Sequence, residues 1–361
     1  MMKDDQADEP IKQFVRAQTD IEIDKYSDTG ANGELYFCKR KVLGDRAALK
    51  FYYYNSSVSS HQEPLLLKEI KHENILEIFD AKIIDNQYAY FLTPEISGGD
   101  LHKFIENNII STKTAICITQ GILKGLSALH NEPYNFVHRD LKPNNILIDK
   151  NSLKPYIADF GSIKKIPDAK DSVVASKNTF IYKPYEAIID SIYTKQSDIY
   201  QVGVILFQLL NGFFPNAPVN WLNDRQRKKL NKITGSFEQW EYIEECISRK
   251  IVSSTLLDNN SLPIYIDTSL KRIINAATNN DLSKRYRSCA EFLKALFDYS
   301  KKAKDWKAVD EIIFATDKTQ NEYKIYQSKK GYILKTKKKN GNWRKDNNHS
   351  GGLNDIINYL F

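Results

Sequence analysis

The chain has 361 residues, of which 42% are hydrophobic and 12% aromatic, and it carries a formal net charge of +7. This length exceeds one average domain and falls short of three, and the apolar content suffices for a full core and excludes global disorder. The excess charge lies at one end, because residues 301–361 contain fourteen Lys and Arg against seven Asp and Glu. We therefore expect a large, charge-balanced body followed by a small basic module over 305–361.

The cysteines and the apolar runs indicate the compartment. Four cysteines without paired spacing argue for reduced thiols in a cytosolic protein, and against a disulfide framework or a zinc site; they are Cys38, Cys117, Cys246 and Cys289. The first ten residues are acidic and polar, which excludes a secretory signal. The longest apolar run, Val202 to Leu210, is too short to span a bilayer and suits a central buried helix. The sequence thus predicts a cytoplasmic protein with no membrane partner.

The N-terminal part divides into two kinds of sequence. Residues 1–17 lack a strong hydrophobic period, so we expect a flexible extension there. From Ile21 to Tyr54, short apolar and aromatic runs broken by glycines predict β-strands. Gly30 and Gly33 lie within the segment 28–35, where glycine lets backbone N–H groups approach a ligand closely. By themselves, two glycines at a hairpin tip are equally consistent with an ordinary turn.

The next elements complete a β-rich first part. Lys50 ends an apolar strand, a place where a lysine is usually only solvated. Pro64 suits only the first turn of a helix, so the helix there begins near Glu63 or is short and irregular. Two strands follow, at Leu76–Ile84 and Gln87–Thr93.

The chain then turns helical. Lys103–Asn108 and Thr112–His130 place apolar residues three and four apart, with Ser111 or Thr112 as the N-cap of the longer helix. A further helix is predicted from Ser288 to about Lys304. Together with the central apolar run, these segments predict a larger helical second part.

One stretch between the helices is rich in chemically active side chains. It reads His138-Arg139-Asp140-Leu141-Lys142-Pro143-Asn144-Asn145-Ile146-Leu147, followed by Asp159-Phe160-Gly161. Apolar runs flank it, so we expect a β-hairpin that brings Asp140, Lys142, Asn145 and Asp159 together at one end. The oxygens of Asn145 and Asp159 suit a hard cation such as Mg²⁺. The stretch therefore indicates a reaction centre, and a surface loop of turn formers is the alternative.

This order of residues resembles the catalytic and metal-binding loops of the eukaryotic-like serine/threonine protein kinases, over about residues 20–300. The resemblance implies an α+β fold of two lobes, with a small β-rich N-lobe at 18–96 and a larger helical C-lobe at 97–304. It also implies transfer of the γ-phosphoryl group of ATP, with Mg²⁺, to a Ser or Thr hydroxyl of a protein substrate. Lys142, two residues after Asp140, is the form seen in serine/threonine kinases.

The resemblance assigns roles to the catalytic residues. Asp140 would accept the proton of the substrate hydroxyl, and Lys142 would face the transferring phosphoryl group. Asn145 and Asp159 would hold the metal ions that neutralise the phosphate oxygens.

The resemblance also implies a nucleotide site, built from Gly30, Gly33, Leu35, Ala48, Lys50, Thr93, Glu95, Ile96 and Leu147. Lys50 would contact the α- and β-phosphates and be held by Glu63. Thr93 would guard the rear of the adenine pocket and, being small, leave it open. In the hinge that follows, Ile96 would donate the backbone hydrogen bond to the adenine, because Pro94 has no N–H.

The segment from Asp159 to Glu186 corresponds to the kinase activation segment. In the family, an arginine placed like Arg139 often pairs with a phosphate on this segment, and Ser172 and Ser176 are the candidate acceptors. Thr179 aligns with the threonine that braces the catalytic residues.

Three more positions belong to the resemblance. Glu186 and Arg285 would form a buried ion pair, although Pro184-Tyr185 departs from the family's usual Ala-Pro before this glutamate. Asp198 would fix the backbone of the catalytic loop.

The basic C-terminal segment resembles no family that we recognise. Three short strands, Tyr323–Gln327, Gly331–Lys337 and Gly341–Arg344, followed by a helix over Leu353–Leu360, predict a β-β-β-α module. Tyrosines and a tryptophan alternate there with lysines. We favour packing on the kinase body or docking of a protein partner, and nucleic acid is possible but less favoured.

Two alternatives to a protein kinase remain open. A pseudokinase scaffold that binds nucleotide weakly and acts through docking is favoured by Asp28 in place of the first glycine of the phosphate loop, by Pro64 and by Tyr185. A kinase that phosphorylates a small molecule is the other, and the long activation segment favours a protein substrate over it.

Overall fold

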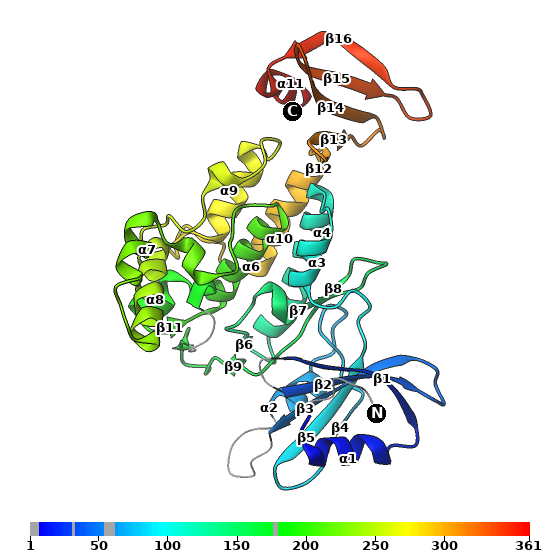
Figure 1. Ribbon diagram of the computed structural model, residues 1–361, viewed down its shortest axis with the longest axis vertical. Helices are drawn as coiled ribbons and strands as arrows, with labels where there is room; N and C mark the ends of the chain where they lie inside the picture. Colours follow the sequence, from blue (N-terminus) through cyan, green and yellow to red (C-terminus); the bar gives the residue numbers. More distant parts are fainter. Residues whose placement is uncertain (1–6, 31–32, 54–61, 176–179) are drawn as a thin grey trace.

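The computed structural model describes residues 7–30, 33–53, 62–175 and 180–361. A β-rich lobe, a helical lobe and a separate C-terminal sheet follow one another along the long axis of the molecule (Figure 1). The catalytic loop lies between the β-rich lobe and the helical lobe, so the relative position of these two lobes determines the geometry of the site. No helix of the described ranges combines the length and the apolar character needed to cross a bilayer.

The N-lobe is an antiparallel five-stranded sheet of order β1-β2-β3-β5-β4. Its strands are β1 (Ile21–Gly30), β2 (Gly33–Arg40), β3 (Arg46–Tyr53), β4 (Asp80–Ile83) and β5 (Tyr88–Pro94). β4 is shorter than the predicted strand at 76–84. Helix α2 (Gln62–Glu69) follows β3. The register places Leu35 opposite Lys50, and Ala48 opposite Thr93, so these residues of three strands lie side by side.

The prediction of a flexible extension over residues 1–17 is wrong for the residues that are described. Helix α1 (Glu9–Ala17) lies on the N-lobe sheet, and Ile11 is only 2% exposed. The Phe14 ring lies 6.0 Å from that of Phe51 and 4.9 Å from that of Tyr90, measured between centroids. The helix forms because an aromatic face of the sheet covers its single apolar stripe, and the helix sequence alone does not reveal that partner.

The C-lobe is built around helix α6, whose residues from Ser197 to Leu209 are all buried. Its helices are α3 (Leu101–Asn107), α4 (Thr112–His130), α5 (Tyr185–Ile189), α6 (Lys195–Leu209), α7 (Asp224–Leu230), α8 (Ser236–Val252), α9 (Thr268–Ala277) and α10 (Cys289–Ser300). Its short strands are β6 (Phe136–Val137), β7 (Ile146–Ile148), β8 (Pro155–Ile157), β9 (Lys164–Lys165), β10 (Val173–Val174) and β11 (Ile192–Tyr193). The predicted N-cap is formed, since Ser111 Oγ accepts a hydrogen bond from Thr114 N. All four cysteines are free thiols.

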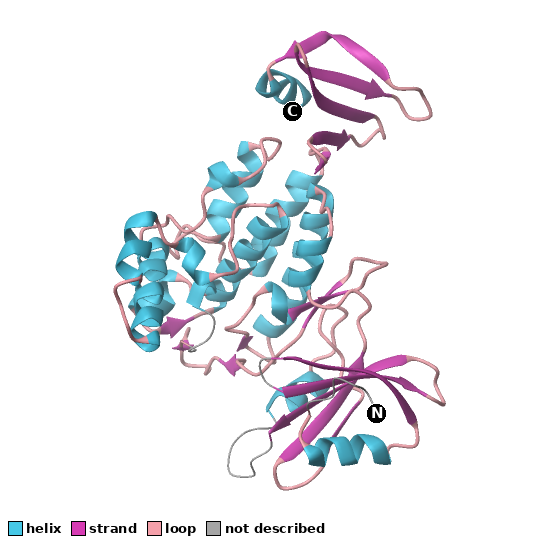
Figure 2. Ribbon diagram, in the orientation of Figure 1, coloured by secondary structure: helices cyan, strands magenta, loops and turns pink. Residues whose placement is uncertain are grey.

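The C-terminal module contains five strands where three were expected. They are β12 (Asp305–Val309), β13 (Ile312–Thr316), β14 (Glu322–Ser328), β15 (Gly331–Lys337) and β16 (Arg344–Gly351), followed by helix α11 (Leu353–Leu360). β12 and β13 were missed because their tight turn, Asp310-Glu311, lacks the usual Asn-Gly or Asp-Gly signal, although both residues adopt positive φ (47° and 64°). Of the predicted third strand at 341–344, residues 341–343 form a loop, and Arg344 begins β16 (Figure 2).

The module is packed on the C-lobe through its first strand. Trp306 is 1% exposed, and its ring stacks on that of Tyr265 with centroids 5.9 Å apart. At the N-terminus of α4, Thr112 Oγ1 accepts a hydrogen bond of 2.8 Å from Trp306 N, and Asp305 Oδ1 accepts one of 2.8 Å from Lys113 N. Strand β12 therefore fixes the module to the start of the helix that leads into the catalytic loop.

Candidate active site

The catalytic loop folds as the predicted hairpin, with β7 paired to β8. The Asp140 carboxylate accepts hydrogen bonds of 3.0 Å from Lys142 Nζ and of 3.0 Å from Asn145 Nδ2. Asn145 Nδ2 also donates to the backbone oxygen of Asp140 at 2.8 Å. The amide nitrogen of Asn145 is therefore committed to Asp140, which leaves the Asn145 Oδ1 oxygen as the atom that could bind a metal ion.

A second cluster joins the two lobes. Lys50 Nζ on β3 lies 3.1 Å from Glu63 Oε1 on α2 and 4.0 Å from Asp159 Oδ1. Glu63 Oε1 also accepts a hydrogen bond of 3.2 Å from Phe160 N, so it binds both the lysine and the loop after β8. Burial disfavours the charged amine, but Glu63 and Asp159 outweigh burial and raise the pKa of Lys50. Lys50 is therefore a fixed positive charge in the cleft at neutral pH.

The start of α2 determines whether this cluster can form. The helix is described from Gln62, so Pro64 falls in its first turn, where no intrahelical hydrogen bond needs its missing N–H. Glu63 can thus point at Lys50 in spite of the proline that follows it.

The donor set matches the chemistry of magnesium. Mg²⁺ binds oxygen, and in nucleotide enzymes one or two protein ligands complete a shell made mostly of water and phosphate oxygens. Asn145 Oδ1 and the Asp159 carboxylate supply two such oxygens from neighbouring loops. These residues fit the metal that the sequence implied for them.

Helix α6 holds the catalytic loop from beneath. The buried Asp198 carboxylate accepts hydrogen bonds from His138 N (2.8 Å) and Arg139 N (2.9 Å), and its Oδ2 lies 2.8 Å from His130 Nε2. Arg139 has φ of 70°, a left-handed conformation that persists only where its surroundings fix it. Asp198 provides that restraint one residue before Asp140.

Gln201, one turn after Asp198, has a related role that sequence reasoning missed. Its Oε1 accepts a hydrogen bond of 2.8 Å from Leu141 N, and its Nε2 donates to Tyr182 O at 3.2 Å. Gln201 thereby links the catalytic loop to the end of the activation segment. The available signal was an amide within an otherwise apolar buried helix, since such a group needs buried partners.

Replacing Asp198 with asparagine should distort the catalytic loop without creating a cavity, because the two side chains have nearly the same volume. The amide nitrogen would face a backbone N–H in place of an acceptor, and one unsatisfied buried donor costs about 1–3 kcal/mol. We expect a lower urea midpoint and a larger loss of turnover than stability alone explains. Asp171→Asn, which removes an exposed carboxylate, is the control. Unchanged stability and turnover in the Asp198 variant would contradict the anchoring role.

Arg139 contacts the activation segment directly. Its Nε donates to Ser162 O at 2.6 Å, and an Nη atom donates to Val174 O at 2.9 Å. The arginine thus binds the activation segment at two points, near its start at Ser162 and near its middle at Val174. Val174 lies two residues after Ser172. The predicted phosphate acceptor Ser176 and the bracing residue Thr179 lie outside the described residues, as does the side chain of Asp28.

The predicted pair of Glu186 and Arg285 is formed. Arg285 Nη1 lies 2.8 Å from Glu186 Oε1 and Nη2 lies 3.0 Å from Oε2, a bidentate geometry between side chains that are 0% and 3% exposed. Ser197 Oγ donates a further hydrogen bond to Glu186. The end of the activation segment is therefore tied to the start of α6 and to the segment before α10.

The residues predicted for the nucleotide lie on both sides of the cleft. Ala48 and Thr93 are buried neighbours on β3 and β5, and Gly30 faces Gly33 at the β1–β2 tip. Leu35 lies on β2 opposite Lys50, and Leu147 lies on β7 of the C-lobe. The hinge residues are Glu95, whose carboxylate lies 2.6 Å from Arg46 Nε, and Ile96, whose oxygen accepts from Gly99 N.

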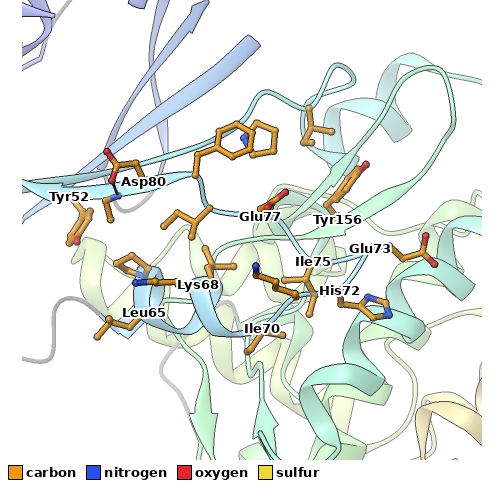
Figure 3. A pocket seen from close by; sticks show the side chains of 18 of the residues that line it. Tyr52, Leu65, Lys68, Ile70, His72, Glu73, Ile75, Glu77, Asp80 and Tyr156 are labelled. Atoms are coloured by element: carbon orange, nitrogen blue, oxygen red, sulfur yellow. Dashed lines mark hydrogen bonds between the residues drawn. The ribbon is translucent and has the colours of Figure 1, made fainter. Parts of the chain in front are cut away.

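A cavity in the described part of the chain lies apart from these groups. It measures about 1080 Å³ and is lined by α2, by the segment that leads into β4, and by β4 itself. Leu65 and Lys68 of α2 border it together with Ile75 and Tyr156 (Figure 3). Of the predicted site residues only Ile96 lines it, so this hollow is behind the hinge and does not contain the catalytic loop.

Sequence comparisons agree with this geometry. The protein kinase domain, as a family profile, matches residues 28–298. The chain is 29% identical to the serine/threonine-protein kinase TIO of Arabidopsis thaliana over 197 residues, which is 52% of this chain and 14% of that protein. It is 31% identical to the serine/threonine-protein kinase VIK of the same plant over 163 residues, which is 44% of this chain and 37% of that protein.

A fungal relative is more similar still over a longer stretch. The chain is 33% identical to the mitogen-activated protein kinase hog1 of Botryotinia fuckeliana over 218 residues, which is 56% of this chain and 59% of that protein. The matches thus cover less than two thirds of each of these three relatives. The family profile, in contrast, spans most of this chain and both lobes of the site. The chain belongs to the protein kinase family.

Proposed function

We propose that this protein is a serine/threonine kinase that transfers the γ-phosphoryl group of ATP to hydroxyl groups of proteins. The observation that carries the proposal is the joining of Lys50, Glu63 and Asp159 in one charged cluster. These residues come from β3, α2 and the loop after β8. A kinase needs both the Lys–Glu pair, which positions the lysine on the phosphates, and the aspartate that holds the metal ion.

Each side chain has a task in the transfer. Asp140 accepts a hydrogen bond from the substrate hydroxyl, whose oxygen attacks the γ-phosphorus while the bond to the bridging oxygen of ADP breaks. The hydroxyl proton passes to the Asp140 carboxylate. Lys142, 3.0 Å from that carboxylate, places its positive charge next to the transferring group. Lys50 holds the remaining phosphates, so the chain contributes positioning and charge more than covalent chemistry.

Bound Mg²⁺ would neutralise the charge that develops on the phosphate oxygens. Asn145 and Asp159 would hold it through their side-chain oxygens. The hydrogen bonds from Asn145 Nδ2 to Asp140 fix the orientation of the amide, so its oxygen is presented without rearrangement.

Two features support a protein substrate with a serine or threonine acceptor. Lys142 stands two residues after Asp140, as in serine/threonine kinases. The activation segment is held by Arg139 and by the pair of Glu186 and Arg285, and in the family this segment forms the platform for a protein substrate. Ser172 precedes by two residues the Val174 carbonyl that Arg139 binds, and its phosphorylation would order the platform further.

Labelled ATP tests the proposal directly. Wild-type protein with Mg²⁺ should label itself or a general acceptor such as myelin basic protein, on serine or threonine by phosphoamino-acid analysis. Asp159→Ala should abolish the labelling while leaving the fold intact by circular dichroism, and chelation of Mg²⁺ should do the same. Nucleotide binding without any turnover would instead establish a pseudokinase, and labelling of small molecules alone would exclude a protein substrate.

A further inference from the structure

A row of lysines crosses the C-terminal sheet. The strand register aligns one residue from each of the five strands, in the order Lys307, Phe314, Lys324, Lys335 and Lys345. Residues directly opposite each other on antiparallel strands point to the same face of a sheet. Four lysines and one aromatic ring therefore form a band across the full width of one face.

The face that carries this lysine row lies opposite the core of the module. The alternate residues Trp306, Ala315, Ile325 and Leu334 are all buried, which places the core of the module on the other face. Helix α11 lies along one side of the sheet and closes that core (Figure 1). Lys307 and Lys345, at the two ends of the row, are exposed to solvent.

No carboxylate of the described residues neutralises the lysines of the row. In the described ranges, none of the four lysines forms an ion pair, and the one pair on this face joins Lys337 to Glu322 at 2.7 Å. Like charges placed directly opposite each other destabilise a sheet, and this applies to Lys324, Lys335 and Lys345 on adjacent strands. An arrangement of this kind favours an anionic ligand that neutralises several lysines together.

Aromatic rings lie among these lysines. Lys324 Nζ is 5.6 Å from the ring centre of Phe314 and 5.9 Å from that of Tyr326, and Lys335 Nζ is 5.5 Å from Tyr326. Trp343, in the loop at the edge of the face, is 38% exposed and lies near Lys337. The face thus combines cations for phosphates with flat apolar surfaces for bases.

We propose that this face binds single-stranded nucleic acid, with phosphates on the lysine row and bases against Phe314, Tyr326 and Trp343. An acidic protein segment would match the lysines but would leave the rings unused, whereas every base has a face that can stack on them. Trp306 stacks on Tyr265 of the C-lobe, and the module lies at the end of that lobe that is far from the N-lobe (Figure 1). The bound strand would therefore leave the catalytic cleft open.

Fluorescence anisotropy with the full chain tests the proposal. The probes are labelled oligo-dT and oligo-U of about 20 nucleotides, longer than the common site of a single-strand binding domain. Each neutralised phosphate adds about 0.7 to the slope of log affinity against log salt, so Lys324→Gln with Lys335→Gln should lower that slope by about 1.4. Tyr326→Ala should weaken binding about 5- to 150-fold, the effect of losing one stacked base.

The controls distinguish binding by the lysine row from non-specific binding to any basic surface of the protein. Arg225→Gln with Lys228→Gln removes two exposed charges from the basic run of α7 and should leave the affinity unchanged. Thermal unfolding checks that the module persists, and Lys307→Gln with Lys345→Gln is the substitute if the central pair unfolds it. Kinase activity should be unaltered in all of these variants.

Three results would overturn the proposal. The first is the absence of binding to either oligonucleotide at low salt. The second is binding that the Arg225 and Lys228 changes weaken as much as those at Lys324 and Lys335. The third is a poly-glutamate peptide that displaces the oligonucleotide at equal or lower concentration and binds Tyr326→Ala as well as the wild type, which would establish an acidic protein partner.

Discussion

Replacing Asp140 with asparagine should lower kcat by about 10²- to 10⁴-fold, the usual contribution of a positioned proton acceptor. The asparagine keeps the shape of the side chain, and its oxygen can still accept from Lys142 and Asn145. It has no carboxylate to take the proton of the substrate hydroxyl. The KM for ATP should change little, because the nucleotide is held by Lys50 and the residues of the N-lobe.

Steady-state kinetics with a peptide or protein acceptor measures this effect. The control is Asp168→Asn, which removes an exposed carboxylate from the same stretch of chain. It should leave kcat within about twofold and unfold at the wild-type urea concentration, as expected for an exposed position. Asp140 is buried and paired with Lys142, so circular dichroism and urea unfolding check separately that Asp140→Asn is folded under the assay conditions. A kcat for Asp140→Asn within tenfold of the wild type would exclude Asp140 as the base and direct attention to another proton acceptor.

The sequence predicted structure well where the structure depends on residues that are close together in the chain. The hairpin around Asp140, the cap at Ser111 and the buried run of α6 follow from local rules of turn, cap and period. Pairs distant in the chain, such as Lys50 with Glu63, were predicted only through the family resemblance. Physical reasoning from spacing alone could not have brought them together.

The features that were missed depend on partners distant in the sequence. Helix α1 forms because Phe51 and Tyr90 project from the outer face of the N-lobe sheet, and strand residues do not reveal which of their faces will be covered. The role of Gln201 depends on a backbone N–H sixty residues earlier in the chain. The lysine row needed the register of five strands, two of which lacked recognisable turn residues.

Removing Arg285 should destabilise the protein by about 3–5 kcal/mol, the cost of leaving a buried carboxylate without its partner. Arg285→Met keeps much of the volume but loses both hydrogen bonds to Glu186. It also loses those from Nε to Asn279 O (2.7 Å) and from Nη1 to Gln196 O (2.9 Å). Urea unfolding followed by tryptophan fluorescence measures the loss.

The neighbouring Lys284 supplies the matched control. It pairs with Asp281 at 3.2 Å, but its side chain is 70% exposed, and exposed pairs contribute about 0–1 kcal/mol. Lys284→Met should therefore change the free energy of unfolding by less than about 1 kcal/mol. Equal losses of unfolding free energy in Arg285→Met and Lys284→Met would show that burial of the pair of Arg285 and Glu186 adds nothing to its contribution to stability.

The double variant Glu186→Gln with Arg285→Met decides whether the loss comes from the pair itself. Once Arg285 is absent, an ionised Glu186 is the remaining cost, and a neutral glutamine removes it. We therefore expect the double variant to be destabilised by clearly less than the sum of the two single changes, with a coupling of about 0.5–3 kcal/mol. Additive losses would mean that Arg285 acts through its backbone contacts alone. Strong coupling with reduced kcat in every variant would mean that this pair holds the activation segment in the form that phosphoryl transfer requires.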